Sequence, residues 1–135
     1  MRRSEQRRDA VFACYQWDVT GRPLDELLPP GATPFTRELA EGVVEHSAEL
    51  DEEIARHAKG WSLDRIAPLD LNIMRVALYE IRFRDDVPTE VAIDEAVELA
   101  KQYCGVEAPG FVNGVLGAAV RDREPVARPE AGSGQ

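Results

Sequence analysis

The most apolar stretch of the chain reads LDLNIMRVALYEIRF at residues 69–83, and it decides the fold. Its large apolar residues recur at helical spacing, because Leu71 is followed by Met74, Leu78 and Ile81 at offsets of three, seven and ten. This spacing places the four side chains on one helix face and predicts a helix at the centre of a helical core. A polar stripe on the same helix comprises Asn72, Arg75, Tyr79 and Arg82.

Helical periodicity also marks the segments on either side. Besides residues 69–83, helices are expected at residues 4–19, 35–58, 63–67, 90–104 and 109–121. Ser4 and Ser62 are the expected N-caps of the helices that follow them. Gly105 is the expected C-cap of the helix before it, and Tyr103 is expected on the inward face of that helix.

Glycine and proline separate these helices, most densely between Gly21 and Pro34. The dipeptide Asn113-Gly114 would usually indicate a hairpin turn. Apolar residues at helical offsets lie on both sides of it, so we expect a helix in which Gly114 and Gly117 let a neighbour approach closely. Because no alternating strand pattern is present, the sequence predicts an all-α fold of six or seven helices with short connections.

Length and composition favour one globular domain. The chain has 135 residues, of which 44% are apolar. We expect a single domain at residues 1–121 and a disordered tail at residues 122–135. Apolar runs of only about six residues are far shorter than a membrane span, which needs about 20, and a cytoplasmic location is expected. Cys14 and Cys104 fit reduced core thiols with raised pKa values better than a disulfide.

The charge of the chain is strongly negative but unevenly distributed. Sixteen Lys and Arg residues face 25 Asp and Glu, giving a formal net charge of -9. Residues 1–10 carry a net charge of +2, so the remaining 125 residues carry -11. Phosphate repels such a body, which argues against indiscriminate nucleic-acid binding. A basic end on an acidic body can touch RNA locally while the body attracts a basic partner, and a solvated, frayed terminus is the alternative interpretation.

No enzyme or metal signature is present. His46 and His57 lie on one expected helix, eleven residues apart, which separates them by about 16 Å along its axis. The chain has no Cys-x-x-Cys or His-x-x-x-His spacing, no Gly-x-Ser-x-Gly elbow and no glycine-rich phosphate loop. We therefore expect neither a catalytic activity nor a metal or other cofactor.

Nucleic-acid recognition is the remaining chemistry. The arginines of residues 1–10 are followed within one to two helical turns by Tyr15 and Trp17. Arginine binds phosphate and stacks on bases, and an aromatic ring can stack an unpaired base. Trp17 falls on the apolar stripe of its helix and is typical of a core residue. Tyr15 lies on another face and is the better candidate for an exposed platform.

Four stretches together resemble the NusB family of transcription antitermination factors. They are RRDAVFACYQW at residues 7–17, LDLNIMRVALYEI at 69–81, VPTEVAIDEAVELAK at 87–101 and FVNGVL at 111–116. They occur in the order of the family, and the resemblance covers about residues 4–120.

The resemblance implies an all-helical fold of two small helical bundles packed on each other. It also implies binding of the boxA sequence in nascent ribosomal RNA transcripts, together with NusE, a small-subunit ribosomal protein. The family acts in a transcription antitermination complex with RNA polymerase, where it helps the polymerase read through terminators and so promotes transcription of rRNA operons.

The resemblance also implies roles for particular residues. The expected RNA-binding residues are Arg2, Arg3, Arg7, Arg8, Tyr15 and Phe111. Asp70 matches an acidic position close to the surface for RNA and NusE. Arg75 and Tyr79 are expected to hold the two bundles together, and Glu80 is expected to be structural.

Two interpretations without RNA contact remain open. Tyr15 and Phe111 fit ordinary packing positions as well as an RNA surface. The whole chain also fits a helical protein–protein adaptor or a dimerisation module, because an apolar helix face can pair with a second copy. Such a homodimer would compete with other partners wherever the two surfaces overlap.

Overall fold

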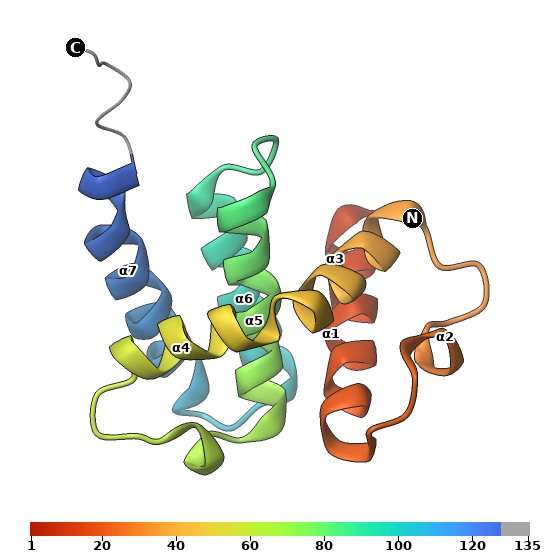
Figure 1. The fold of residues 1–135 in the computed structure, drawn as a ribbon, viewed down its shortest axis with the longest axis horizontal. Coiled ribbons are helices and arrows are strands. Elements are labelled where there is room, and N and C mark those ends of the chain that lie inside the picture. Colours follow the sequence, from red (N-terminus) through yellow and green to blue (C-terminus); the bar gives the residue numbers. More distant parts are fainter. Residues whose placement is uncertain (128–135) are drawn as a thin grey trace.

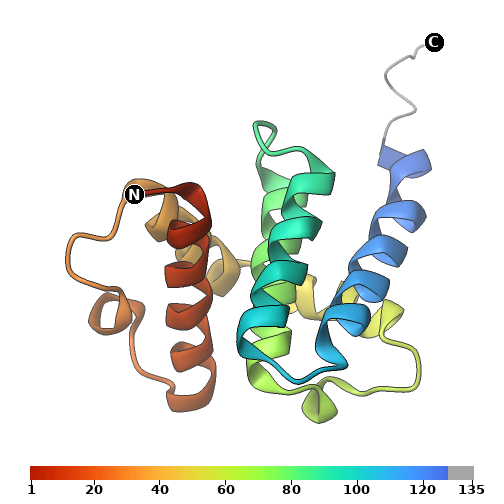
Figure 2. The same ribbon diagram turned by 180° about the vertical axis from the view of Figure 1, so that it is seen from behind.

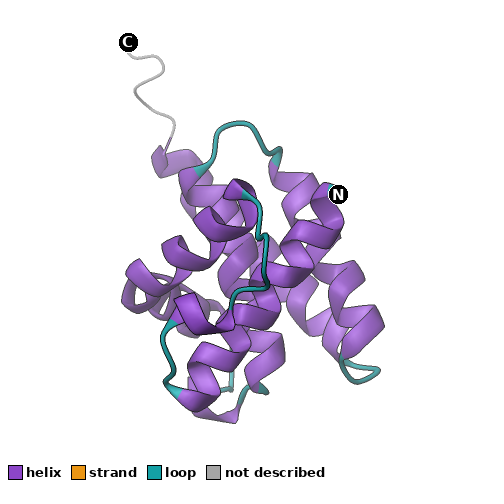
Figure 3. Cartoon of the chain, turned by 90° about the vertical axis from the view of Figure 1, so that its right-hand side faces the viewer, coloured by secondary structure: helices purple, strands orange, loops and turns teal. Residues whose placement is uncertain are grey.

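The computed structural model describes residues 1–127. Within this range the chain consists of helices joined by loops and contains no strand (Figure 3). The helices of the first half are α1 (Arg3–Thr20), α2 (Leu24–Leu27), α3 (Pro34–Glu45) and α4 (Ser47–His57). A short 3-10 helix, η1 (Leu63–Arg65), precedes α5 (Pro68–Phe83), α6 (Thr89–Tyr103) and α7 (Ala108–Ala127).

The helices form two groups that meet along α5. The helices α1, α2 and α3 gather on one side, and α4 to α7 gather on the other (Figure 1). Helix α1 packs against both α3 and α5, and α6 packs against α5 and α7. The view from behind shows α6 in front of α5, between α1 and α7 (Figure 2). The predicted all-α fold of two packed bundles is confirmed.

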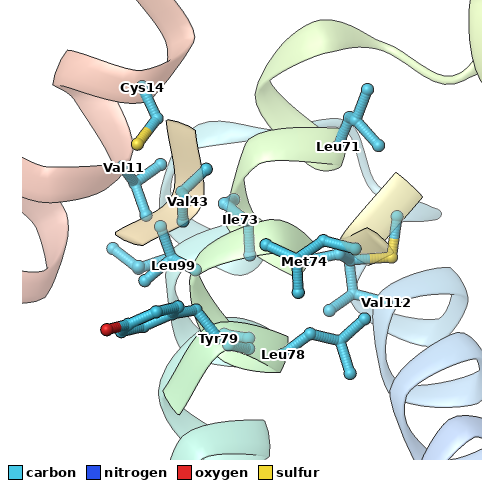
Figure 4. Packing of buried hydrophobic residues seen from close by; sticks show 14 of the residues in the cluster. Val11, Cys14, Val43, Leu71, Ile73, Met74, Leu78, Tyr79, Leu99 and Val112 are labelled. Carbon is cyan, nitrogen blue, oxygen red and sulfur yellow. The ribbon is translucent and has the colours of Figure 1, made fainter. Parts of the chain in front are cut away.

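Helix α5 is the centre of the core. Every residue from Leu71 to Glu80 is buried. In Figure 4, Met74 and Leu78 of α5 point toward Val112 of α7, and Val11 of α1 lies on the opposite side. Since α5 has neighbours all around it, Asn72, Arg75 and Tyr79 of its polar stripe are buried as well and need internal partners.

These partners come from both bundles. The Arg75 guanidinium donates to Asp51 of α4 at 2.7 Å and to Asp18 of α1 at 3.0 Å. The Tyr79 hydroxyl lies 3.4 Å from a carboxylate oxygen of Glu38 in α3. The expectation that Arg75 and Tyr79 hold the two bundles together is confirmed.

The segment expected as one helix at residues 35–58 is two helices. The chain bends at His46, whose φ of -107° and ψ of 20° are not helical. The bend lets α3 pack on α1 in the first bundle while α4 packs on α5 and α7 in the second. A single straight helix could not cover both surfaces, and periodicity alone did not indicate the change of direction.

Two of the three expected helix caps are wrong, and the third is confirmed in position only. Ser4 does not cap α1, because Arg2 occupies the N-cap position and the Ser4 hydroxyl donates to Glu95 of α6. Gly105 is not the C-cap of α6, since Cys104 holds that position in extended backbone. Ser62 does hold the N-cap position of η1, as expected, but its hydroxyl donates to the Asp64 carboxylate and makes no capping hydrogen bond to the backbone.

The glycine that permits close helix packing is also a different one from those expected. A Cβ atom at Gly114 would have open space around it, and one at Gly117 would meet only Arg121 of its own helix. A Cβ atom at Gly42 would lie 2.2 Å from the ring of Tyr79. The close approach therefore occurs where α3 crosses α5.

Helix α7 is longer than predicted. It continues to Ala127, beyond the expected end of the domain at residue 121. The sequence from Ala118 to Glu124 contains no glycine or proline, so the helical pattern has no local reason to stop there. Of the tail expected to be disordered at residues 122–135, residues 128–135 lie outside the described residues.

Candidate nucleic-acid interface

The arginines of the first ten residues separate into three environments, and Arg7 lies in the interior. Its side chain is 6% exposed, and its Nε atom donates to both carboxylate oxygens of Glu80 at 3.0 and 2.9 Å. The Glu80 side chain is 1% exposed. Position 7 shares the inner face of α1 with Ala10 and Cys14, which explains its burial. The expectation that Arg7 offers an exposed RNA contact is wrong, whereas the structural role expected of Glu80 is confirmed.

Arg3 contacts the first bundle instead of the aromatic residues of α1. Its guanidinium lies 3.8 Å from the centre of the Phe35 ring in α3, and the guanidinium of Arg84 lies 4.8 Å from the same ring. Arg2 and Arg3 are exposed, but they precede Tyr15 by more than three helical turns, or about 18 Å along the axis. The two residues therefore do not form one patch with Tyr15.

Arg8 is the arginine that lies on the same side of α1 as the aromatic residues. Phe12 follows Arg8 by four residues and Tyr15 follows it by seven, so the three side chains form one stripe. The Phe12 ring packs edge-on against Tyr103 of α6, with 5.1 Å between the ring centres. Tyr103 is 43% exposed, contrary to its expected inward position, and Tyr15 is half-buried. We call Arg8, Phe12, Tyr15 and Tyr103 the α1–α6 surface.

The charge of Arg8 is stabilised by its neighbours. The Asp9 carboxylate accepts a hydrogen bond from the guanidinium at 3.3 Å. This hydrogen bond is the main cause of a raised Arg8 pKa, and the Tyr103 hydroxyl contributes to the shift. The charged Arg8 guanidinium therefore lies on the same surface as the exposed Tyr103 and the half-buried Tyr15.

The groove between the first turns of α1 and the second half of α6 has mixed charge. It has a volume of about 250 Å³ and is lined by Arg2, Ser4, Glu5, Arg8, Glu95, Glu98, Leu99 and Gln102. Three carboxylates against two guanidinium groups make this end unfavourable for a run of phosphates. The more favourable part of the α1–α6 surface is its other end, around Tyr15 and Tyr103.

The remaining two expected site residues line a second groove. Asp70 and Phe111 share a groove of about 340 Å³ with Trp61, Arg65, Ile66, Ala67, Glu107 and Ala108. It lies where η1, the start of α5 and the start of α7 come together, at the bottom of Figure 1. We call it the Trp61 groove.

Aromatic and cationic groups meet in the Trp61 groove. The rings of Trp61 and Phe111 pack edge-on with 6.0 Å between their centres, and the Arg65 guanidinium lies 5.8 Å from the Trp61 ring. Trp61 is 48% exposed. Neither Trp61 nor Arg65 was expected from the sequence to be a site residue. A large aromatic residue between a glycine and a serine at a helix break was the available signal.

The α1–α6 surface and the Trp61 groove meet near Asp70 and the end of α6. Asp70 lies in the first turn of α5, where the helix dipole favours a carboxylate. Its carboxylate lies close enough to the thiol of Cys104, the residue that follows Tyr103, to help raise the pKa of that thiol. Burial, and secondarily Asp70, raises the pKa of Cys104 to about 12. Asp70 thus lines the Trp61 groove on the side that faces the end of α6.

The other candidate chemistries find little support among the described residues. Burial raises the pKa of Cys14 to about 12, so both cysteines have the raised pKa expected, but Cys14 alone is a core thiol, because Cys104 is half-buried. Residues 1–127 contain no cluster of three or more His, Cys, Asp or Glu side chains arranged to hold a metal ion. In the same range no helix combines the length and apolar character needed to cross a membrane.

Comparison with known proteins places the chain in a family. A sequence model of the NusB family matches residues 4–121. The transcription antitermination protein NusB of Geobacillus kaustophilus is 45% identical over 121 residues, which cover 86% of this chain and 93% of the relative. A structure of T. maritima NusB has a TM-score of 0.83 at 31% identity and covers 90% of this chain and 92% of that one.

A further solved structure contains the antitermination factors NusB and NusE in complex with dsRNA. The matched chain in it has a TM-score of 0.78 at 28% identity, over 90% of this chain and 99% of that chain. The family model, the close relatives and the common arrangement of helices agree: the chain belongs to the NusB family.

Proposed function

We propose that this protein binds the boxA sequence of nascent ribosomal RNA transcripts together with NusE, and so promotes transcription of rRNA operons by an RNA polymerase antitermination complex. The observation that carries the proposal is the α1–α6 surface, where Arg8 lies beside the exposed Tyr103 and the half-buried Tyr15 on an otherwise acidic protein. A structurally similar NusB was solved with NusE and dsRNA. Single-stranded RNA is the form whose bases can be splayed onto such rings.

The two kinds of side chain would do different work. Arg8 would neutralise one phosphate. This contact would contribute the salt-dependent part of the affinity, which does not depend on the RNA sequence. Tyr15 and Tyr103 would each stack an unpaired base, and one such stack is worth about 1–3 kcal/mol. Asp70 would face the RNA or NusE where α5 meets the end of α6.

NusE would supply the positive charge that this protein lacks. A net charge of -9 repels RNA and attracts a basic ribosomal protein, which speeds their association. The protein alone should therefore bind RNA weakly. The pair should bind boxA much more tightly than either partner does.

Fluorescence anisotropy with a labelled boxA RNA and a scrambled RNA of equal composition tests the proposal. Each RNA is titrated with the protein, with NusE and with both together. We expect a clear preference for boxA that is largest with both proteins present. Equal affinity for the two RNAs under all three conditions would overturn the proposal.

An adaptor without RNA contact makes a different prediction for one variant. Arg8→Ala should weaken boxA binding if the α1–α6 surface binds RNA, and should leave it unchanged if the protein acts only through other proteins. Arg7 must stay intact in this comparison, because its loss would leave Glu80 buried and unpaired. Sedimentation of the protein at several concentrations tests the separate expectation of a homodimer.

A further inference from the structure

We propose that the Trp61 groove holds one unpaired base of the bound RNA, and that it favours bases that carry an amino group. This inference rests on the proposed function and extends the RNA path beyond Phe111 to residues that no family resemblance assigned. The groove joins an exposed indole, an edge-on phenyl ring, a guanidinium group and two carboxylates.

The apolar part of the groove suits a flat ring. Trp61 remains 48% exposed although Phe111 packs against it, so indole surface is left for a ligand. Ile66, Ala67 and Ala108 complete the apolar lining. The volume of about 340 Å³ lies at the small end of the range for ligand sites, about 300–1,000 Å³.

The polar groups point to a nucleotide instead of an apolar peptide. Arg65 lies beside the Trp61 ring, where its guanidinium can pair with the phosphate of a stacked nucleotide. Asp70 and Glu107 line the same groove, and an ionised carboxylate only accepts hydrogen bonds. Adenine, cytosine and guanine carry an amino group that can donate to these oxygens, whereas uracil does not.

The position of the groove fits a continuous RNA path. Asp70 and Glu107 line the groove, and Glu107 follows Tyr103 of the α1–α6 surface by only four residues. An RNA strand with one base stacked on Tyr103 would therefore reach Phe111 and Trp61 with its next few nucleotides. The loop from Gly105 to Glu107 bridges the two sites in the sequence.

Tryptophan fluorescence tests base stacking directly, because the chain has two tryptophans, Trp17 and Trp61. The variant Trp17→Phe reports on Trp61 alone, and the matched control Trp61→Phe reports on Trp17 alone. Both are titrated with boxA RNA in the presence of NusE, while anisotropy of the labelled RNA follows binding in the same sample. We expect quenching of Trp61 that follows the binding curve, and a smaller change of Trp17.

Changes in affinity provide a second readout. Trp61→Ala should weaken boxA binding by roughly 5- to 150-fold, the range for loss of one stacked base, while Trp61→Phe retains part of the affinity. Arg65→Ala should lower the salt dependence of binding, and thermal unfolding of each variant shows whether the fold is intact. Abasic sites placed along boxA identify the nucleotide whose removal abolishes the quenching.

The four bases at that nucleotide then test the preference. Adenine, cytosine and guanine should each bind more tightly than uracil, and Glu107→Gln should reduce the difference. RNA binding without quenching of Trp61, or without loss of affinity in Trp61→Ala, would overturn the inference and leave the proposed function standing. Equal binding of boxA and scrambled RNA by the unaltered protein would overturn both.

Discussion

Replacing Arg7 by alanine tests whether the Arg-rich start of the chain serves the fold or RNA. The Arg7 guanidinium donates two hydrogen bonds to Glu80, at 3.0 and 2.9 Å, between side chains that are 6% and 1% exposed. Glu95 adds a third charge at 4.0 Å from Arg7. Arg7→Ala would therefore leave a carboxylate in the interior with its main partner gone.

The expected cost follows from this burial. Removing one partner of a buried ion pair destabilises a protein by about 3–5 kcal/mol, because the remaining charge is uncompensated. A whole domain is stable by only about 5–15 kcal/mol, so Arg7→Ala should bring this protein close to unfolding. Arg8→Ala, on the exposed side of the same helix, should change the free energy of unfolding by less than about 0.5 kcal/mol.

Urea unfolding followed by circular dichroism measures both variants. The double variant Arg7→Met with Glu80→Gln serves as the control, since removing both charges should recover much of the loss. An Arg7→Ala protein that is as stable as the unaltered one, but has lost boxA binding, would refute the structural assignment of Arg7.

The stability of Arg7→Ala should also depend on pH in a direction that can be predicted. Burial raises the pKa of Glu80 above its usual 4.5 in the folded protein, although Arg7 opposes this shift. A carboxyl group with a raised pKa binds more protons in the folded state, so its contribution to stability increases as pH falls through that pKa toward 4.5. Loss of Arg7 raises the pKa further, so the destabilisation by Arg7→Ala should be smaller at pH 5 than at pH 7.5.

Three further outcomes are expected. Arg8→Ala should weaken boxA binding several-fold and reduce the slope of log K against log salt by about 0.7, the value for one phosphate contact on a single strand, as anisotropy at several salt concentrations will show. Gly42→Ala should lower the melting temperature by the equivalent of about 1–3 kcal/mol, because its Cβ would lie 2.2 Å from the Tyr79 ring; an unchanged melting temperature would mean that the ring moves freely. Cys14 and Cys104 should react very slowly with iodoacetamide at pH 8, since pKa values of about 12 leave only ~0.01% thiolate; rapid alkylation of the folded protein would contradict these values.

Periodicity was sufficient to predict the helical class and the central helix. The apolar residues of α5 repeat at helical offsets, and the structure buries Leu71, Met74 and Leu78, while Ile81 is half-buried. The polar stripe of α5 was less informative, because the sequence does not show whether such a stripe faces water or a partner. In the structure Arg75 reaches Asp18 and Asp51 on two other helices, and only tertiary packing brings these groups together.

The candidate site was predictable in part. A cluster of arginines in the sequence suggests one basic patch. On a helix, however, successive side chains are rotated by about 100°, so Arg7 points inward and Arg3 lies over Phe35. Trp61 and Phe111 are far apart in the sequence, and nothing local indicates that their rings meet. Resemblance supplied the positions of Tyr15 and Asp70, whereas the burial of Arg7 required coordinates.

The most direct test of the α1–α6 surface is an amide NMR titration of the isotope-labelled protein with boxA RNA in the presence of NusE, set against a titration with scrambled RNA. Shifts specific to boxA should cluster at residues 8–15 of α1 and at Tyr103 and the loop after it. Shifts that are the same for both RNAs, or that occur only on α3 and α4, would show that RNA is not held by Arg8 and its aromatic neighbours.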